Sequence, residues 1–413
     1  MARLGAIPQA RRIKWGGRTV SALVLAVVAY FGLCSTFANI IAKTDPQRAS
    51  AIVPWNGRIA ALASRSLIEG RTEGERLEEA AAIARQALQR EPTAVPAVAA
   101  LGLVAQLQGD ISSSARAFSL SERLSRRDIQ TQLWAIENSV ARGDLRGALK
   151  HYDIALRTSQ HAPDLLFPVL ATAVEDASVR SVIVETLTKR PSWSLLFVDY
   201  IASNGPDPIA TGALFSDLMR HGFKVSEGAN TAVIYGLFSS GSLDKAWAYY
   251  AMVRGNVKYT ESRDPRFASN IMSPSFFDWM PVNDTGITAS IEPGSAGGTF
   301  NFTIAPRTSG AVLQQVQILP PGRYILDGHV VFSDAADRDR PYWALECRGG
   351  PELGRLELPS TSAEGGARYH GIFVVPAGCP SQTLSLIARA ASGFTDVAGR
   401  IDEARLYPER GSQ

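Results

Sequence analysis

A ten-residue motif recurs at an interval of 34 residues, as GDISSSARAF at 109–118 and GDLRGALKHY at 143–152. Both copies begin with Gly-Asp and end on an aromatic residue, Phe118 or Tyr152. Glycine adopts the positive φ that a tight turn between helices needs, and the aspartate after it can cap the next helix. Apolar residues at three- and four-residue spacing surround both copies, as is typical of amphipathic helices. The motif therefore predicts helical hairpins that repeat along the chain.

The interval and its landmarks resemble the tetratricopeptide repeat, a helical hairpin of 34 residues. The matching positions are Gly102, Gly109, Phe118, Gly143, Ala148 and Tyr152, with a further copy at Ala246 and Tyr250. The resemblance implies closely packed hairpins whose aromatic residues fill the grooves between neighbours. Stacked hairpins also leave a concave groove that receives a protein partner. We predict such a domain over 57–260, with less regular hairpins at 163–226; a plain spacer is the alternative.

A basic N-terminus precedes an uncharged stretch of 24 residues at 19–42. As a helix this stretch would be about 36 Å long, enough to cross a hydrocarbon core of about 30 Å. Residues 1–18 carry five Lys and Arg and no acid, a bias that keeps an N-terminus in the cytoplasm. We predict a cytoplasmic tail at 1–18, a transmembrane helix at 19–42 and a periplasmic body, which makes a single-pass protein of a bacterial inner membrane.

A cleaved signal peptide is the alternative interpretation of this stretch, with an apolar core at 20–33 and cleavage after Ala38. Cys34 follows Leu33, where a lipoprotein signal needs a small residue. We therefore predict that Cys34 is a buried apolar thiol rather than a site of lipid attachment.

The charge of the remaining chain argues against nucleic-acid binding. The whole sequence holds 42 Lys and Arg against 39 Asp and Glu. Without the five basic residues of the tail, the body has 37 basic and 39 acidic residues, a net charge of −2. Such a body has no extended basic surface for phosphates, so we predict no nucleic-acid partner.

Short runs of alternating apolar and polar residues fill the last third of the chain. They lie at 299–304, 311–319, 322–332, 343–348, 355–358, 369–375, 383–388 and 399–407, with Gly and Pro between them. Alternation at period two with regular turn residues is typical of an antiparallel β-sandwich. We predict a jelly-roll-like sandwich over 275–409 and an aperiodic linker over 261–274.

Two cysteines, Cys347 and Cys379, lie at the ends of neighbouring predicted strands. Both fall on the side that the charge bias exports, where disulfides form. We predict a disulfide between them, which would stabilise the sandwich by roughly 3–4 kcal/mol in the chain-entropy description. Two free buried thiols are the alternative.

Three segments of this region resemble a carbohydrate-binding-module-like jelly roll: FDW at 277–279, PGRY at 321–324 and RIDEARL at 400–406. The resemblance implies a sugar-binding face on which aromatic rings stack against pyranose rings. The candidates are Trp279, Tyr342, Trp343 and Tyr369. For each of these residues the alternative is a place in the hydrophobic core.

The sequence lacks the motifs of P-loop, dinucleotide-binding, zinc-peptidase and nucleophile-elbow proteins. We predict no catalytic residue, no cofactor and no metal site, and expect no enzyme. Two weaker hypotheses stay open. Asp334, Asp337 and Asp339 could hold calcium in a loop, and Glu346 with Asp402 could form a glycosidase pair.

The sequence thus predicts a multidomain α + β protein with a membrane helix, a tetratricopeptide-like solenoid and a β-sandwich. We expect a non-enzymatic accessory protein of exopolysaccharide or cell-surface assembly. Its repeats would recruit a protein, and its sandwich would bind a glycan or a protein. A purely structural protein without sugar binding and a carbohydrate-active enzyme are the alternatives.

Overall fold

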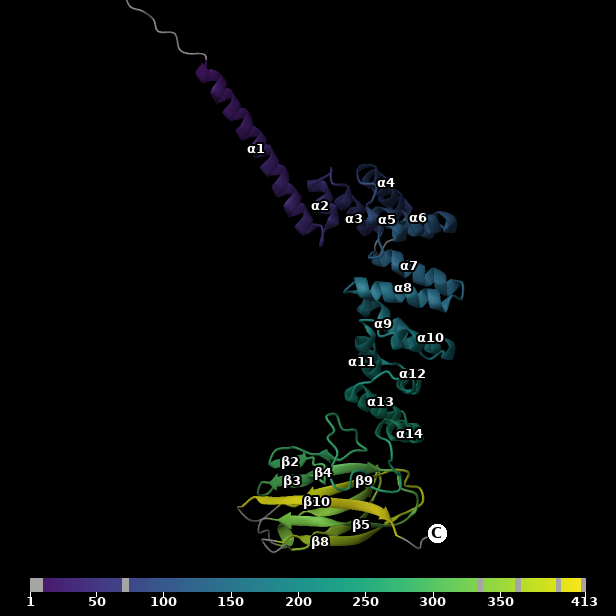
Figure 1. The fold of residues 1–413 in the computed structure, drawn as a ribbon, viewed down its shortest axis with the longest axis vertical. Helices are drawn as coiled ribbons and strands as arrows, with labels where there is room; N and C mark the ends of the chain where they lie inside the picture. Colours follow the sequence, from purple (N-terminus) through teal and green to yellow (C-terminus); the bar gives the residue numbers. More distant parts are fainter. Residues whose placement is uncertain (1–9, 69–73, 333–336, 361–364, 391–394, 410–413) are drawn as a thin grey trace, which may run out of the picture. The chain divides into compact units, whose positions relative to one another are not determined.

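The computed structural model describes residues 10–68, 74–332, 337–360, 365–390 and 395–409. Within these residues fourteen α-helices come first and two antiparallel sheets follow (Figure 1). The chain forms two compact units. The first unit comprises residues 1–166 with 191–193, and the second comprises 167–190 with 194–413. The predicted fold class, helical repeats followed by a β-sandwich, is confirmed.

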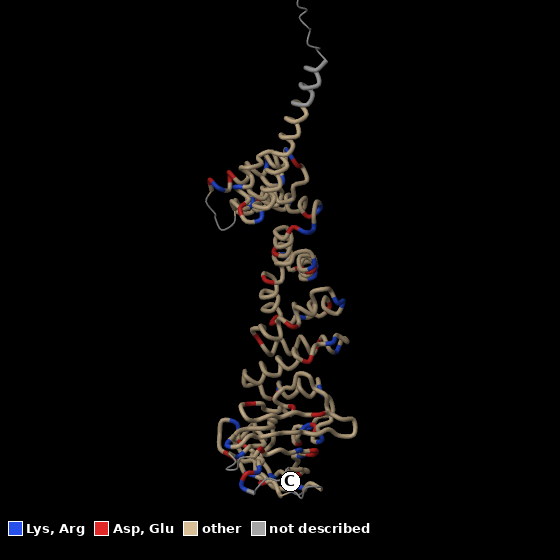
Figure 2. Tube along the Cα trace, turned by 90° about the vertical axis from the view of Figure 1, so that its left-hand side faces the viewer, with Lys and Arg blue, Asp and Glu red and all other residues tan. Residues whose placement is uncertain are grey.

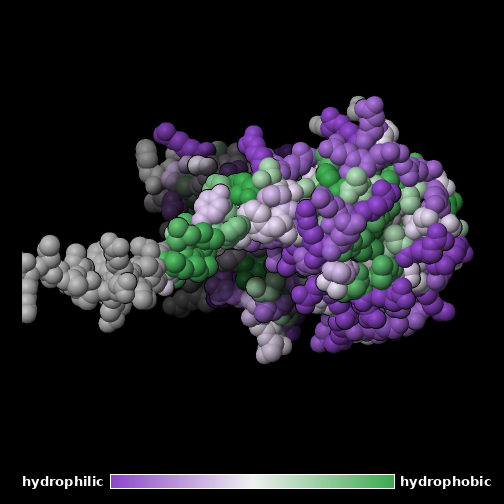
Figure 3. Space-filling model, turned by 90° about the horizontal axis from the view of Figure 1, so that it is seen from above, coloured by the Kyte–Doolittle hydropathy of each residue, from purple (hydrophilic) through white to green (hydrophobic). Residues whose placement is uncertain are grey.

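The first unit holds the long N-terminal helix and the regular repeats. Its helices are α1 (Ala10–Ile41), α2 (Pro46–Ile52), α3 (Gly57–Ile68), α4 (Gly74–Arg90), α5 (Val95–Leu107), α6 (Ile111–Leu124), α7 (Ile129–Ala141) and α8 (Leu145–Thr158). Within α1, the segment Val20–Ile41 is long and apolar enough to cross a membrane. Its described part shows a continuous apolar surface in Figure 3. Residues 1–9 of the expected cytoplasmic tail lie outside the described residues.

The Gly-Asp turns have the geometry that the repeated motif predicts. Gly109 and Gly143 have φ values of 80° and 71°. The carboxylate of Asp110 accepts a hydrogen bond from the backbone N–H of Ser113 at 2.9 Å, and Asp144 accepts one from Gly147 at 2.8 Å. Each turn therefore ends one helix and caps the next, which fixes α5 against α6 and α7 against α8.

The segment 163–226, in which the 34-residue repeat is not regular, is also helical. The helices are α9 (Ala162–Ala173), α10 (Ala177–Thr188), α11 (Ser194–Asn204), α12 (Pro208–Arg220), α13 (Glu227–Ser239) and α14 (Leu243–Arg254). Asp176, Asp207 and Ser226 cap α10, α12 and α13 with their side chains.

In the view of Figure 2, Lys and Arg lie among Asp and Glu along the helices and the sandwich.

The sandwich belongs to the second unit together with these last helices. One sheet has the order β1-β4-β9-β6-β7 and the other the order β2-β3-β10-β5-β8. Every strand pair is antiparallel. The strands are β1 (Met280–Pro281), β2 (Ile287–Glu292), β3 (Thr299–Ile304), β4 (Gly310–Gln317), β5 (Gly322–Phe332), β6 (Tyr342–Cys347), β7 (Glu352–Glu357), β8 (Ala367–Val375), β9 (Gln382–Ala388) and β10 (Val397–Pro408).

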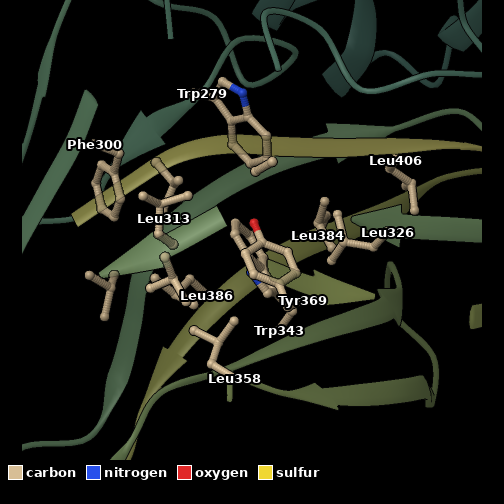
Figure 4. Packing of buried hydrophobic residues seen from close by; sticks show 14 of the residues in the cluster. Trp279, Phe300, Leu313, Leu326, Trp343, Leu358, Tyr369, Leu384, Leu386 and Leu406 are labelled. Carbon is tan, nitrogen blue, oxygen red and sulfur yellow. The ribbon is translucent and has the colours of Figure 1, made fainter. Parts of the chain in front are cut away.

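Alternate residues of the strands fill the space between the two sheets. Along β5 the burial alternates from Tyr324 to Phe332, because successive side chains of a strand point to opposite faces. The core holds Trp279, Trp343 and Tyr369 among aliphatic residues, as Figure 4 shows.

The segment 261–274 corrects the expectation of a linker. Arg263 and Phe267 in this segment are 4% and 0% exposed. The backbone of Ser262 donates to Leu406 at 2.8 Å, and Ala404 donates to Pro265 at 2.8 Å. The segment lacks strand or helix periodicity because it packs as an irregular strap against β10, where single residues rather than an alternating face enter the core.

Candidate functional site

Arg263 is the centre of the junction between α14 and the sandwich. Its guanidinium donates to the carbonyl of Phe277 at 2.9 Å, to Oε1 of Gln317 at 2.6 Å and to the carbonyl of Val316. Its backbone N–H donates to Oε1 of Gln315 at 3.1 Å. Burial lowers the pKa of Arg263 to about 10, so the group remains a cation at neutral pH. A buried cation with this many acceptors fixes the strap against β4.

A second polar cluster joins α14 to the start of the sandwich through Asp278. This buried carboxylate accepts hydrogen bonds from Tyr250 and Arg254 of α14, both at 2.9 Å. It also accepts from the backbone and the hydroxyl of Ser275, at 2.8 and 2.9 Å. Burial, and then the charge of Asp278, raise the pKa of the Tyr250 phenol. Tyr250, a predicted repeat landmark, therefore attaches the last repeat to the sandwich.

Aromatic rings fill the space between these two polar clusters. The indole of Trp247 lies 5.4 Å from the ring of Tyr250 and 5.5 Å from that of Phe277, measured between centroids. The guanidinium carbon of Arg263 lies 5.5 Å from the Trp247 centroid, within the range of a cation–π contact. Arg348, which follows β6, lies 4.3 Å over Phe238 of α13. The last hairpin and the sandwich therefore share one packed interface within the second unit.

A pocket of about 490 Å³ opens beside this interface. Its walls come from α14 (Asp244 and Trp247), from Tyr259, from the β4–β5 loop at 318–321 and from the β8–β9 loop at 378–380. Its volume falls within the range of roughly 300–1,000 Å³ that is usual for small-molecule sites. Three prolines and two aromatic residues make the lining mostly apolar, and Asp244 is the one charged residue among the lining residues.

The two loop walls are held in place by Gln382 and by the disulfide. The amide of Gln382 donates to the carbonyl of Cys379 at 2.7 Å and accepts from the backbone of Leu319 at 2.9 Å. Gln382 is fully buried, so these bonds connect the two loops without competition from water. Cys379 is bonded to Cys347, with 5.7 Å between the two Cα atoms. The predicted disulfide is therefore present, and it supports one wall of the pocket.

Three polar groups at the pocket have no hydrogen-bond partner among the described residues. They are the indole N–H of Trp247, the phenol of Tyr259 and the carboxylate of Asp244. The Tyr259 side chain is 48% exposed, and Trp247 is half-buried. The pocket is thus lined by two aromatic side chains and one carboxylate. These features suit a small molecule that has both apolar faces and hydroxyl groups.

The four aromatic residues predicted to bind sugar do not form such a face. Trp279, Trp343 and Tyr369 are 5%, 0% and 3% exposed and pack in the core (Figure 4). Tyr342 is half-buried, and the guanidiniums of Arg355 and Arg389 lie 4.8 and 4.7 Å from its ring centroid. The resemblance suggested these residues as a sugar-binding face, but Trp279, Trp343 and Tyr369 lie in the core, where the two sheets meet.

Trp279 lines a second cavity. This cavity has a volume of about 360 Å³ and is also lined by Arg254, Arg263 and Asp278. Because the Trp279 indole donates to the carbonyl of Asp264 at 3.0 Å, its polar edge is already used within the protein.

The residues of the suggested glycosidase pair and of the suggested calcium loop lie in different parts of the structure. Glu346 lies on β6 of one sheet, whereas Asp402 lies on β10 of the other, at a β-bulge. The carboxylate of Asp402 contacts Nδ1 of His329 at 2.8 Å. Asp334 lies outside the described residues, as does the side chain of Asp337.

Sequence reasoning missed Trp247, Tyr259, Arg263 and Gln382. Trp247 lies in the third copy of the repeat motif, GSLDKAWAYY at 241–250, where it resembled an ordinary core position. The buried Arg263 gave no signal, because an arginine in a polar stretch is normally solvated.

Parts of the chain are similar in fold to solved structures of other proteins. No protein-family model matches the sequence, and no curated protein matches it. The solved structures include the CBM22-1 xylan-binding domain from Paenibacillus barcinonensis, which is 11% identical, with a TM-score of 0.25 over 36% of this chain and 93% of that one. TmCBM61 in complex with β-1,4-galactotriose is 14% identical, with a TM-score of 0.25 over 38% and 99%.

A third solved structure is PilW, a type IV pilus biogenesis factor. It is 11% identical, with a TM-score of 0.26 over 48% of this chain and 93% of that one. Each of these likenesses covers less than half of the chain. The assignment of the two folds therefore rests on the helices, turns and strand order described above.

Proposed function

We propose that this chain is a membrane-anchored, non-enzymatic accessory protein of the bacterial periplasm that acts in exopolysaccharide or cell-surface assembly. Its repeats recruit a protein partner, and the pocket between α14 and the sandwich binds a segment of neutral glycan. The observation that carries the glycan role is the pocket itself, which Trp247, Tyr259 and Asp244 line together with apolar residues of two loops.

The N-terminal residues support the membrane anchor, and they support the periplasmic location together with the disulfide. The segment Val20–Ile41 has the length and hydropathy of a membrane span. The basic residues before it favour a cytoplasmic N-terminus. The Cys347–Cys379 disulfide suits an oxidising compartment such as the periplasm.

A sugar fits the pocket better than a proline-rich peptide does. A pyranose has C–H faces for Trp247 and Tyr259 and hydroxyl groups that can both donate and accept. A run of prolines offers carbonyl acceptors and no N–H donor, so the Asp244 carboxylate would lose water without gaining a partner. Because Asp244 is the charged residue of the lining, an anionic glycan would also be repelled.

Affinity electrophoresis of the full chain in detergent tests the glycan role. Gels that contain neutral polysaccharide should retard the unmodified protein, whereas gels with an anionic polysaccharide such as alginate should not. Tyr259→Ala and Asp244→Asn should reduce the retardation at least several-fold. Tyr342→Ala is the matched control, because its ring is covered by two arginines, and it should behave as the unmodified protein.

Other outcomes of this experiment would contradict the proposal. No retardation in any polysaccharide would leave the purely structural alternative. Retardation that Tyr342→Ala abolishes and Tyr259→Ala leaves intact would place the sugar on the sandwich face instead. Tight binding of a proline-rich peptide with no sugar binding would change the class of ligand.

The protein-binding role of the repeats is supported by exposed apolar residues on α11. Leu195 and Leu196 are adjacent and are 61% and 63% exposed. A photo-crosslinking residue at position 196 should form a discrete adduct in intact cells. The same residue at Ser181, an exposed position of α10, is the control and should form none. Identical patterns at both positions would favour the spacer alternative.

A further inference from the structure

The second cavity, at the C-terminal end of α14, is separate from the pocket beside Trp247 and Tyr259, and no described residue lines both. Its volume of about 360 Å³ falls within the range of roughly 300–1,000 Å³ that is usual for small-molecule sites. Its walls come from the end of α14, from the strap at 261–274 and from residues of β1 and β2, all within the second unit. The cavity is therefore a candidate site in its own right.

The strap follows a bent course along this cavity. Asp264 and Phe267 have positive φ values of 45° and 52°, which cost non-glycine residues about 1–3 kcal/mol each. Phe267 keeps this conformation because its ring packs against Trp279, with 5.7 Å between the centroids. Asp264 keeps it because its carboxylate accepts from the backbone N–H groups of Ala268 and Ser269, at 2.8 and 3.0 Å. The wall that the strap contributes is thus formed before any ligand binds.

Two guanidiniums and two carboxylates line the cavity, but they do not pair evenly. Asp278 accepts from Nη2 of Arg254 at 2.9 Å. Arg263 donates to neutral oxygens of the backbone and of Gln317. The charge of Asp264 is already stabilised by two backbone N–H groups, and within the described residues it forms no ion pair with either guanidinium. The buried cluster therefore holds two cations for one contacting carboxylate, which favours an anionic ligand.

The guanidinium of Arg254 has donors that the protein does not use. Nη2 donates to Asp278, whereas Nε is buried and has no hydrogen-bond partner among the described residues. Nη1 makes no hydrogen bond within the same residues. The Arg254 side chain is 19% exposed and lines the cavity, so a ligand can reach part of it. An acceptor atom in the cavity would gain a hydrogen bond that is otherwise not made.

The rest of the lining is mostly apolar. Besides Trp279, it includes Ile271, Ile291, Pro274, Pro281 and Pro293. Ser269 and Asn270 of the strap are exposed polar residues of the same lining. A ligand that fits these walls has an apolar body and one polar end.

We propose that this cavity binds a small organic monocarboxylate, with its carboxylate on the guanidinium of Arg254 and its apolar body against Trp279 and the prolines. A carboxylate only accepts hydrogen bonds, so it matches a guanidinium with unused donors. The resulting hydrogen bond is charge-assisted and stronger than one between neutral groups. This site does not depend on the glycan role of the other pocket.

Isothermal titration calorimetry of the full chain in detergent tests the proposal, with phenylacetate as the probe and phenylacetamide as its neutral isostere. Phenylacetate should bind, and the amide should bind about tenfold more weakly because it lacks the charge. Asn270→Asp adds a carboxylate to the exposed part of the lining and should weaken phenylacetate binding several-fold. Asn204→Asp is the matched control, because it makes the same change at an exposed position of α11 outside the cavity. It should leave the affinity unchanged.

Two further variants separate the possible causes. Arg254→Lys can still pair with Asp278 but has no fixed second donor for the ligand, so it should also weaken the binding several-fold. Tyr259→Ala alters the other pocket and should bind phenylacetate as the unmodified protein does, so a failure of the glycan role and a failure of this site are distinguishable.

No binding of phenylacetate, or equal affinities of the acid and the amide, would overturn the proposal. Equal affinities of Asn270→Asp and Asn204→Asp would place the acid outside this cavity and overturn it as well.

Discussion

The ring of Phe118 in α6 lies so close to Gly102 in α5 that a Cβ atom on the glycine would be 2.9 Å from Cδ2 and Cε2 of the ring. On its other side Phe118 stacks on Trp134 of α7, with 4.8 Å between centroids and an interplanar angle of 17°. One aromatic residue therefore holds its own hairpin together and also contacts the next. The pairing explains why the repeat motif requires a glycine in one helix and an aromatic residue in the other.

Gly102→Ala should destabilise the helical repeats by roughly 1–3 kcal/mol, because the added methyl group overpacks a filled contact. The measurement is the midpoint of thermal unfolding followed by circular dichroism at a helix wavelength. Gly74→Ala is the control, since a Cβ at Gly74 meets nothing within 4 Å and alanine favours the helix. An unchanged midpoint for Gly102→Ala would contradict the packing described here.

Arg263→Met should destabilise the second unit by roughly 3–5 kcal/mol, because it leaves buried carbonyl and amide acceptors unpaired. The loss should be visible by calorimetry as a lower unfolding temperature of the sandwich. Arg266→Met removes an exposed arginine three residues away and should change stability by less than about 0.5 kcal/mol. Equal effects of the two substitutions would mean that the buried hydrogen bonds contribute little.

Replacement of both Cys347 and Cys379 by serine should lower the stability of the sandwich by roughly 3–4 kcal/mol, given a sequence separation of 32 residues. It should also weaken glycan binding, because Cys379 belongs to a pocket wall. Denaturant unfolding and affinity electrophoresis measure the two effects. Cys34→Ser, which removes the free cysteine, should change neither. Full binding by the double variant would show that Gln382 alone is sufficient to position the loop.

Acidification should destabilise the repeats through His151. Burial lowers the pKa of this imidazole below its usual 6.5, although the charge of Glu122 opposes the shift. The unfolded chain then binds the proton more readily than the folded one, so the contribution is complete above about pH 6.5 and is lost as the pH falls below it. Unfolding midpoints of the unmodified protein and of His151→Gln, compared between pH 7.5 and pH 5.5, give the check. A parallel pH dependence of the two proteins would rule out this role.

Local patterns predicted the regular parts of the fold well. The runs expected at 299–304 and 322–332 coincide with β3 and β5, and six others overlap β4 and β6 to β10. The strand β2, ITASIE, escaped notice although its burial alternates, because threonine, alanine and serine weaken the apolar signal. The Gly-Asp turns were predictable because one residue type at one position fixes the backbone there.

The candidate site was not predictable in the same way. Trp247, Tyr259 and Gln382 are separated by up to 135 residues in sequence and meet only because the strap at 261–274 folds α14 onto the sandwich. Periodicity identified aromatic residues in the strands correctly but could not tell which sheet face would be covered. That distinction depends on packing between elements, which a single sequence does not display.

The guanidinium of Arg263 has a further consequence, because its partners are neutral oxygens of the backbone and of Gln317 rather than carboxylates. Dissolved ions compete for charge pairs at a surface, but they have no access to this group. The attachment of the strap to β4 is therefore expected to keep its stiffness when the ionic strength outside the cytoplasm rises or falls.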